Sequence, residues 1–194
     1  MISFTEGFER YLIEMKSPAG MAEDSFFEYR KNYAGPSQFD PSLFLIGKLY
    51  TFYYDTSPEK GKFVNRRPLV FFLGRDKDNS RPTIEGLDVM LLPPLDRLNF
   101  FKRIFSSFGS IIERNIEKEN AGEKSQEQLK LDYSSLDSLM LGINYKGAFS
   151  KYSLEKMKNV HEIPYQKWHK MVYLNTRSIV GSSLEEIYKK MYRI

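Results

Sequence analysis

A run of five apolar residues, Leu69–Leu73, constrains the fold of this chain more than any other feature. Pro68 precedes the run and Gly74 follows it, and the run contains the β-branched and aromatic residues that strands favour. A strand with one face in water alternates apolar and polar residues, whereas this run is continuous. The sequence therefore predicts a central strand that is buried on both faces.

Further strands are predicted before and after this run. The segment 44–54 is dense in leucine, tyrosine and phenylalanine and indicates a strand after Gly47. A third strand is expected over 83–92, where Gly86 suits a bulge or a sharp bend because it lacks a side chain. Returning strands are expected at 160–164 and 167–174. Such short strands favour a small, curled antiparallel sheet, a partial barrel in the Src-homology-3 manner.

Helical periodicity interrupts the predicted sheet. Pro93-Pro94 begins a helix in the favoured first-turn position, and apolar residues that recur every three or four positions predict another helix over 126–141. With a short helical stretch at 149–157, these segments form a helical insertion, a hairpin, over about 93–158. The fold class is therefore α+β.

Two Pro-containing breaks, Gly35-Pro36 and Asp40-Pro41, separate the N-terminus from the rest. The sequence predicts an N-terminal helical arm over 1–41 and an α+β domain over 42–194 that ends in a helix. The arm carries more apolar surface than a free monomer usually exposes, so we expect it to bind a partner. Packing of the arm on its own domain is the alternative. The partner-binding residues would be Phe4, Phe8, Phe26 and Phe27.

The excess positive charge lies in the last quarter of the chain. Residues 144–194 carry ten Lys or Arg against four acidic residues, interleaved with aromatic residues. Such a mixture can neutralise phosphates and stack on bases, although lysines also cover ordinary solvent faces and an acidic protein would fit equally well. Tyr165 and Trp168 would stack on a single strand or frayed end, unless they fill the core. The expected DNA contacts are Lys146, Lys151, Lys158, Lys167, Lys170 and Arg177.

Most catalytic chemistry finds no support in the residues. The chain has no cysteine, and His161 and His169 alone do not make a metal site, so we expect neither cofactor nor metal. A phosphate-binding glycine loop and a nucleophile elbow are absent. The apolar runs are too short to span a bilayer, so we expect no membrane contact. One alternative stays open: Arg66-Arg67-Pro68 before a buried strand is similar to the MazF ribonuclease toxins, in which an arginine stabilises the phosphodiester.

The order of several segments over about 44–192 resembles a family of small structural or DNA-end-protector proteins from T-even-like tailed phages. An aromatic strand is followed by a proline-led apolar strand and by a strand that ends in Pro-Pro before a helix. The chain departs from the pattern at Asn65–Arg67 and at Asp88–Met90. The matching segments are Gly47–Asp55, Arg67–Leu73, Gly86–Pro94, Tyr145–Tyr152, Ile163–Leu174 and Ser183–Tyr188.

This resemblance implies a non-enzymatic virion or genome-packaging protein, such as a head–tail or tail component or a DNA-end protector. It would bind neighbouring virion subunits, DNA, or both, as part of a homo- or hetero-oligomeric assembly. We expect it in the virion, and in the host cytoplasm during assembly.

Overall fold

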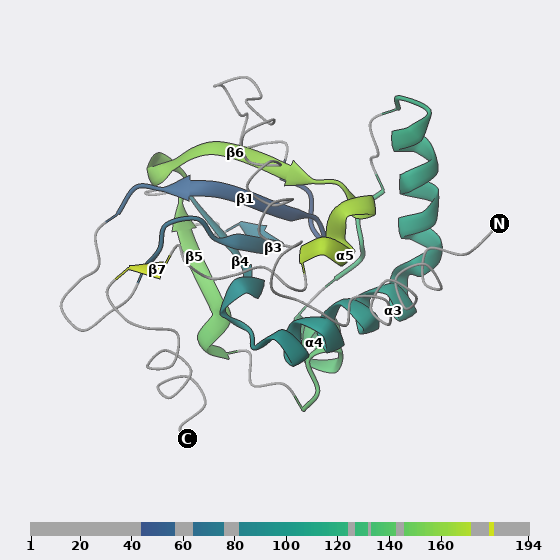
Figure 1. Cartoon of the computed structure of the whole chain (residues 1–194), viewed down its shortest axis with the longest axis horizontal. Helices are drawn as coiled ribbons and strands as arrows, with labels where there is room; N and C mark the ends of the chain where they lie inside the picture. Colours follow the sequence, from purple (N-terminus) through teal and green to yellow (C-terminus); the bar gives the residue numbers. More distant parts are fainter. Residues whose placement is uncertain are drawn as a thin grey trace.

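The computed structural model describes residues 44–56, 64–75, 82–123, 127–131, 133–142, 146–171 and 179–180. Five strands form one antiparallel sheet in the order β5-β4-β3-β1-β6 (Figure 1). They are β1 (Leu49–Tyr54), β3 (Leu69–Arg75), β4 (Thr83–Asp88), β5 (Phe149–Ser153) and β6 (Met157–Ile163). The short strands β2 (Val64–Asn65) and β7 (Ile179–Val180) form a second pair. The expected α+β class is confirmed.

The apolar run forms β3, the middle strand of the sheet, as predicted. Leu69 and Phe71 pack into the cluster on one face of the sheet, while Val70 and Phe72 pack into the cluster on the other. All four side chains are buried. A continuous apolar run is what such a position requires, because neither face of the strand meets water.

The sheet is strongly curled but open. The edge strands β5 and β6 are joined only by the 3-10 turn η4 (Leu154–Lys156), so the two edges approach each other at that end. Figure 1 shows β5 running steeply across the direction of β1 and β6. Among the described residues β5 does not pair with β6, so the barrel is not closed. The Src-homology-3 assignment stays a prediction.

Gly86 lies where two strands approach closely. A Cβ atom at this position would stand 2.3 Å from Val70 Cγ1 and 2.7 Å from the carbonyl oxygen of Phe71. The irregularity in the pairing of β3 and β4 falls on β3, where Leu73 is the extra residue between Phe72 and Gly74. The bulge predicted at Gly86 therefore lies on the neighbouring strand, and Gly86 itself lies at a close approach of β3 and β4.

Two helices follow β4 before the chain returns to the sheet. The turn η2 (Val89–Leu91) leads into α3 (Pro94–Asn120), which begins at a proline as predicted, and α4 (Tyr133–Leu139) follows. Figure 1 shows α3 changing direction along its length, and its Ser106–Ser110 stretch contains the serine and glycine residues at which helices bend. Both helices lie within the segment 93–158, where the sequence predicts a helical insertion.

The helical insertion ends earlier than predicted. One segment predicted to be helical is a strand, and one predicted to be a strand is helical. Residues 149–153 form β5, because they pair with the edge of β4 and bury Tyr152. Residues 165–171 form the turn η5 (Tyr165–Lys167) and α5 (Trp168–Met171) instead of a strand. The helix expected over 126–141 is shortened to α4, and Leu129, which precedes α4, packs closely against Gly47. A further 3-10 turn, η3 (Lys146–Ala148), precedes β5.

A buried lysine attaches the end of α3 to the sheet. The side chain of Lys48 is 1% exposed, and its Nζ lies 2.8 Å from Glu162 Oε1 and 3.3 Å from Glu119 Oε1. The ammonium also stands 4.0 Å from the centre of the Tyr165 ring. Burial raises the pKa of Glu119, and Lys48 opposes this shift. The cluster joins α3, β6 and η5 around one buried charge.

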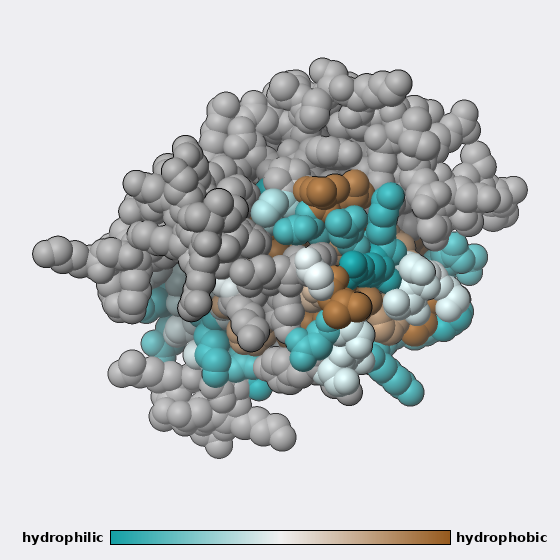
Figure 2. Space-filling view, turned by 90° about the horizontal axis from the view of Figure 1, so that it is seen from below, coloured by the Kyte–Doolittle hydropathy of each residue, from teal (hydrophilic) through white to brown (hydrophobic). Residues whose placement is uncertain are grey.

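Helices cover one end of the outer sheet face. The larger cluster joins Leu49, Phe71 and Ile163 to the apolar side of α3, whereas the smaller cluster fills the inside of the curl. Figure 2 views the molecule from the side of α3 and α4 and shows hydrophobic side chains among hydrophilic ones. Leu95, on α3, and Leu141, which follows α4, are exposed. None of the described helices is long and apolar enough to cross a membrane.

Candidate nucleic-acid interface

A small groove lies on the sheet where β1 and β6 run beside each other. Along β1, Tyr50, Phe52 and Tyr54 belong to the inner cluster. Side chains alternate along a strand, so Thr51 and Tyr53 face the outer side. The groove has a volume of about 170 Å³ and is lined by Thr51, Phe52, Tyr53, Arg67, Asn159 and His161.

A bulge in β6 contributes two of these residues. Thr51 pairs with His161 and Tyr53 pairs with Lys158, so β6 has one residue more than β1 in this interval. Asn159 lies in the bulge with a φ of 51°, a left-handed conformation that asparagine tolerates better than most residues. Bulges re-aim side chains and are frequent beside functional sites. Asn159 lies in the bulge and His161 lies directly after it, and both residues line the groove.

Arg67 is positioned through a buried hydrogen-bond chain. The backbone N–H of Arg67 donates to Asn65 Oδ1 at 3.1 Å, and Asn65 Nδ2 donates to Asp88 Oδ2 at 2.8 Å. Asp88 Oδ1 accepts hydrogen bonds from the backbone N–H groups of Leu69 and Met90, at 3.2 Å and 3.1 Å. Asp88 therefore links the segment before β3 to the end of β4.

Burial dominates the electrostatics of this hydrogen-bond chain around Asp88. Asp88 is fully buried, and burial raises the pKa of its carboxyl to about 6, although hydrogen bonds from Asn65, Leu69 and Met90 favour the charged form. The Tyr152 hydroxyl lies 3.4 Å from Asp88 Oδ2. Burial, and then the Asp88 charge, raise the pKa of Tyr152, so this hydroxyl stays neutral and donates.

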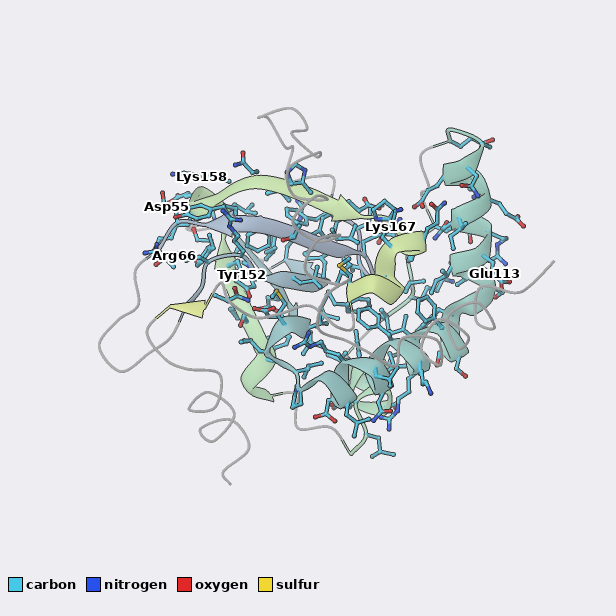
Figure 3. The ribbon with its side chains drawn as sticks, in the orientation of Figure 1. Asp55, Arg66, Glu113, Tyr152, Lys158 and Lys167 are labelled. Carbon is cyan, nitrogen blue, oxygen red and sulfur yellow. The ribbon has the colours of Figure 1, made fainter. Side chains whose placement is uncertain are left out.

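The same end of the sheet carries a group of basic residues. Figure 3 shows Arg66, Lys158 and Asp55 together at this end. Lys158 forms an exposed ion pair with Asp55, and Lys158 lowers the pKa of that carboxyl. Arg66 Nε is buried and has no hydrogen-bond partner among the described residues. Arg67 lines the groove, and two further basic side chains and one carboxylate lie at the same end of the sheet.

The structure separates the lysines that the sequence grouped together. Lys151 lies on the edge strand β5 and pairs with Glu85 at 2.6 Å, whereas Lys158 lies on the opposite edge strand. Lys167 stands at the other end of β6 from Lys158 (Figure 3). The backbones of Lys146 and Lys170 are described, but their side chains are not. Arg177, the arm with Phe4, Phe8, Phe26 and Phe27, and the expected C-terminal helix lie outside the described residues.

Tyr165 and Trp168 belong to the core, which settles the alternatives left open for them. The Trp168 ring packs beside Phe71, Phe101 and Phe105, and its Nε1 donates to the carbonyl of Ile163 at 2.9 Å. Both side chains are fully buried. The idea that these two rings stack on a DNA end is therefore wrong.

A second hollow, of about 410 Å³, lies between α3 and α4 and is lined mainly by serines and Arg103. Arg103 Nη1 already donates to the carbonyl oxygens of Leu139 and Leu141, at 2.8 Å and 2.6 Å. This guanidinium caps the C-terminal end of α4. Several basic residues lie near the groove that Arg67 lines, so that groove is the better candidate for an anionic ligand.

Sequence reasoning missed most of the groove. The alternation along 50–54 places Thr51 and Tyr53 on one face of a strand, but their neighbours on β6 depend on strand pairing that the sequence does not display.

His161 is half-buried, and burial lowers its pKa, so the imidazole is neutral at pH 7. Among the described residues, no group of three His, Cys, Asp or Glu could hold a metal.

A comparison with known protein families gives a match. The family model described as phage T4 terminal DNA protecting protein matches residues 35–192, which include every described residue. Neither curated proteins nor solved structures give a match. The match confirms the resemblance drawn from the order of the strands.

Proposed function

Because this chain belongs to the phage T4 terminal DNA protecting protein family, we propose that it binds and protects the ends of phage DNA without catalysing a reaction. The family match over 35–192 is the observation that carries this proposal. The basic end of the sheet supports it, since cations beside an aromatic side chain are suited to nucleic acid.

The DNA-binding surface that we propose centres on Arg66, Arg67 and Lys158. An exposed ion pair contributes little to stability, so Lys158 can exchange Asp55 for a phosphate at small cost. Arginine offers a planar fork of donors that matches phosphate oxygens. Further contacts from the basic last quarter stay part of the proposal: Lys146, Lys151, Lys167, Lys170 and Arg177.

The protein would act inside the phage particle, together with other virion proteins, as a head–tail, tail or packaging component. In this proposal the arm over 1–41 binds a neighbouring subunit through Phe4, Phe8, Phe26 and Phe27. Replacing Phe4 and Phe8 by Ser in the full chain would then abolish association, measured by light scattering, and leave the melting temperature nearly unchanged. A large loss of thermal stability would assign the arm to its own domain.

An exonuclease assay tests the proposed function directly. Linear duplex DNA incubated with the protein should resist an exonuclease that digests the free DNA completely, and it should remain uncut. Arg67→Gln should weaken this protection, while Lys102→Gln, at an exposed position on α3, serves as the charge-matched control. Absence of protection would contradict the proposal. Cleavage of RNA that disappears in Arg67→Gln would instead favour the ribonuclease-toxin alternative.

A further inference from the structure

We propose that the groove between β1 and β6 seats one unpaired terminal nucleotide of a DNA end, with its base on Tyr53 and its phosphate on Arg67. This inference rests on the proposed function and specifies the part of the DNA end that the protein recognises.

The size of the groove limits what it can hold. A volume of about 170 Å³ equals that of roughly six water molecules in the liquid. It lies below the range of about 300–1,000 Å³ that is usual for drug-sized ligands. One flat ring with its phosphate beside it fits this scale, whereas a base pair does not. The terminal residue would therefore have to be unpaired.

The lining offers both an aromatic ring and hydrogen-bonding groups. Tyr53 is half-buried, so its ring is partly fixed by the protein and partly accessible. The neutral imidazole of His161 has one donor and one acceptor, and Asn159 and Thr51 add an amide and a hydroxyl. These groups can meet the edge of any base, which suits binding without strong sequence preference.

The backbone at the cationic side of the groove is held in place by hydrogen bonds. Arg67 is exposed, but its backbone N–H is fixed by Asn65, which is fixed in turn by the buried Asp88. A fixed backbone leaves only the side-chain rotamers of Arg67 to be ordered when it binds a phosphate. The left-handed backbone at Asn159 is a second unusual feature at the same place, and such conformations cluster at ligand sites.

The test compares three forms of one DNA: a blunt-ended duplex, the same duplex with a short single-stranded extension, and a closed circle. Wild type should bind the extended duplex more tightly than the blunt one. Tyr53→Ala should lower affinity for the extended duplex about tenfold and leave affinity for the blunt duplex nearly unchanged. Tyr53→Phe keeps the ring and should bind like wild type. Arg67→Gln should weaken the extended duplex more than the blunt one, and Lys102→Gln should change neither.

Equal binding of blunt and extended duplexes by wild type would overturn the inference, as would a Tyr53→Ala variant that melts like wild type and binds the extension unchanged. Failure of the proposed function has a different signature: wild type would bind the circle as well as the linear forms. If Tyr53→Ala then still weakened binding of a short single-stranded oligonucleotide, the groove assignment would stand without the DNA-end role.

Discussion

Asn65 donates a hydrogen bond from Nδ2 to the fully buried Oδ2 of Asp88, at 2.8 Å, and accepts one from the backbone N–H of Arg67 on its Oδ1. One amide side chain thus connects a buried carboxylate to the basic residue that lines the groove. Because both ends of the amide are used, its loss affects the core and the binding surface together.

Replacing Asn65 by Ala should lower the free energy of unfolding by about 1–3 kcal/mol, because Asp88 loses a buried partner. Urea denaturation measures this loss. Asn120→Ala is the matched control, since Asn120 accepts an exposed hydrogen bond from Gln166 at 2.8 Å and should cost much less. Equal losses in the two variants would show that the buried hydrogen bond of Asn65 contributes no more to the free energy of unfolding than an exposed one.

Asp88 should also give the stability a characteristic pH dependence. Because burial raises its pKa from 3.8 to about 6, the folded protein binds this proton more tightly than the unfolded chain. The contribution of Asp88 to stability is therefore largest below pH 3.8 and falls, by on the order of 3 kcal/mol, as the pH rises through about 6.

Urea titrations of wild type and Asp88→Asn across this range test the prediction. The free energy of unfolding of wild type minus that of Asp88→Asn should decrease as the pH rises. The titration of Glu119 is common to both proteins and cancels in this difference. Parallel curves would contradict the assigned shift.

Gly86→Ala should destabilise the protein by roughly 1–3 kcal/mol, the usual cost of forcing extra atoms into a packed core. The new Cβ would stand 2.7 Å from the Phe71 carbonyl oxygen, a backbone atom that cannot move away without breaking the sheet. Gly74→Ala is the control within the same sheet, because a Cβ there meets no atom within 4 Å. Thermal melting of both variants decides the point, and a Gly86→Ala protein as stable as Gly74→Ala would refute the close packing.

The salt dependence of DNA binding should report how many cations take part. Neutralisation of phosphates by Arg66, Arg67 and Lys158 alone predicts a slope of about −3 for log affinity against log salt concentration. Six contacts, with Lys146, Lys167 and Lys170 added, would give a slope of about −5. A slope near zero would exclude phosphate contacts as the source of affinity.

A strand whose apolar residues follow one another without interruption could be predicted from the sequence. Leu69–Leu73 is such a run, and only a strand that is buried on both faces explains it. The segment 149–157 has a weak helical period, but residues 149–153 form a strand because they pair with an edge of β4 that is distant in the chain. Trp168 shows the same limit for function. A tryptophan among lysines fits a stacking surface and a core equally well, and only the packing of Phe71 and Phe101 around it decides. The groove depends on the pairing of β1 with β6, which no local pattern reveals.

Competition for an end-labelled linear duplex tests the central claim most directly. Unlabelled linear DNA and the same DNA as a closed circle are added in turn at equal mass, and the displaced label is measured. If the protein binds DNA ends, displacement follows the number of ends added, and the circle competes only weakly through nonspecific phosphate contacts. Equal displacement by linear and circular DNA would contradict the claim.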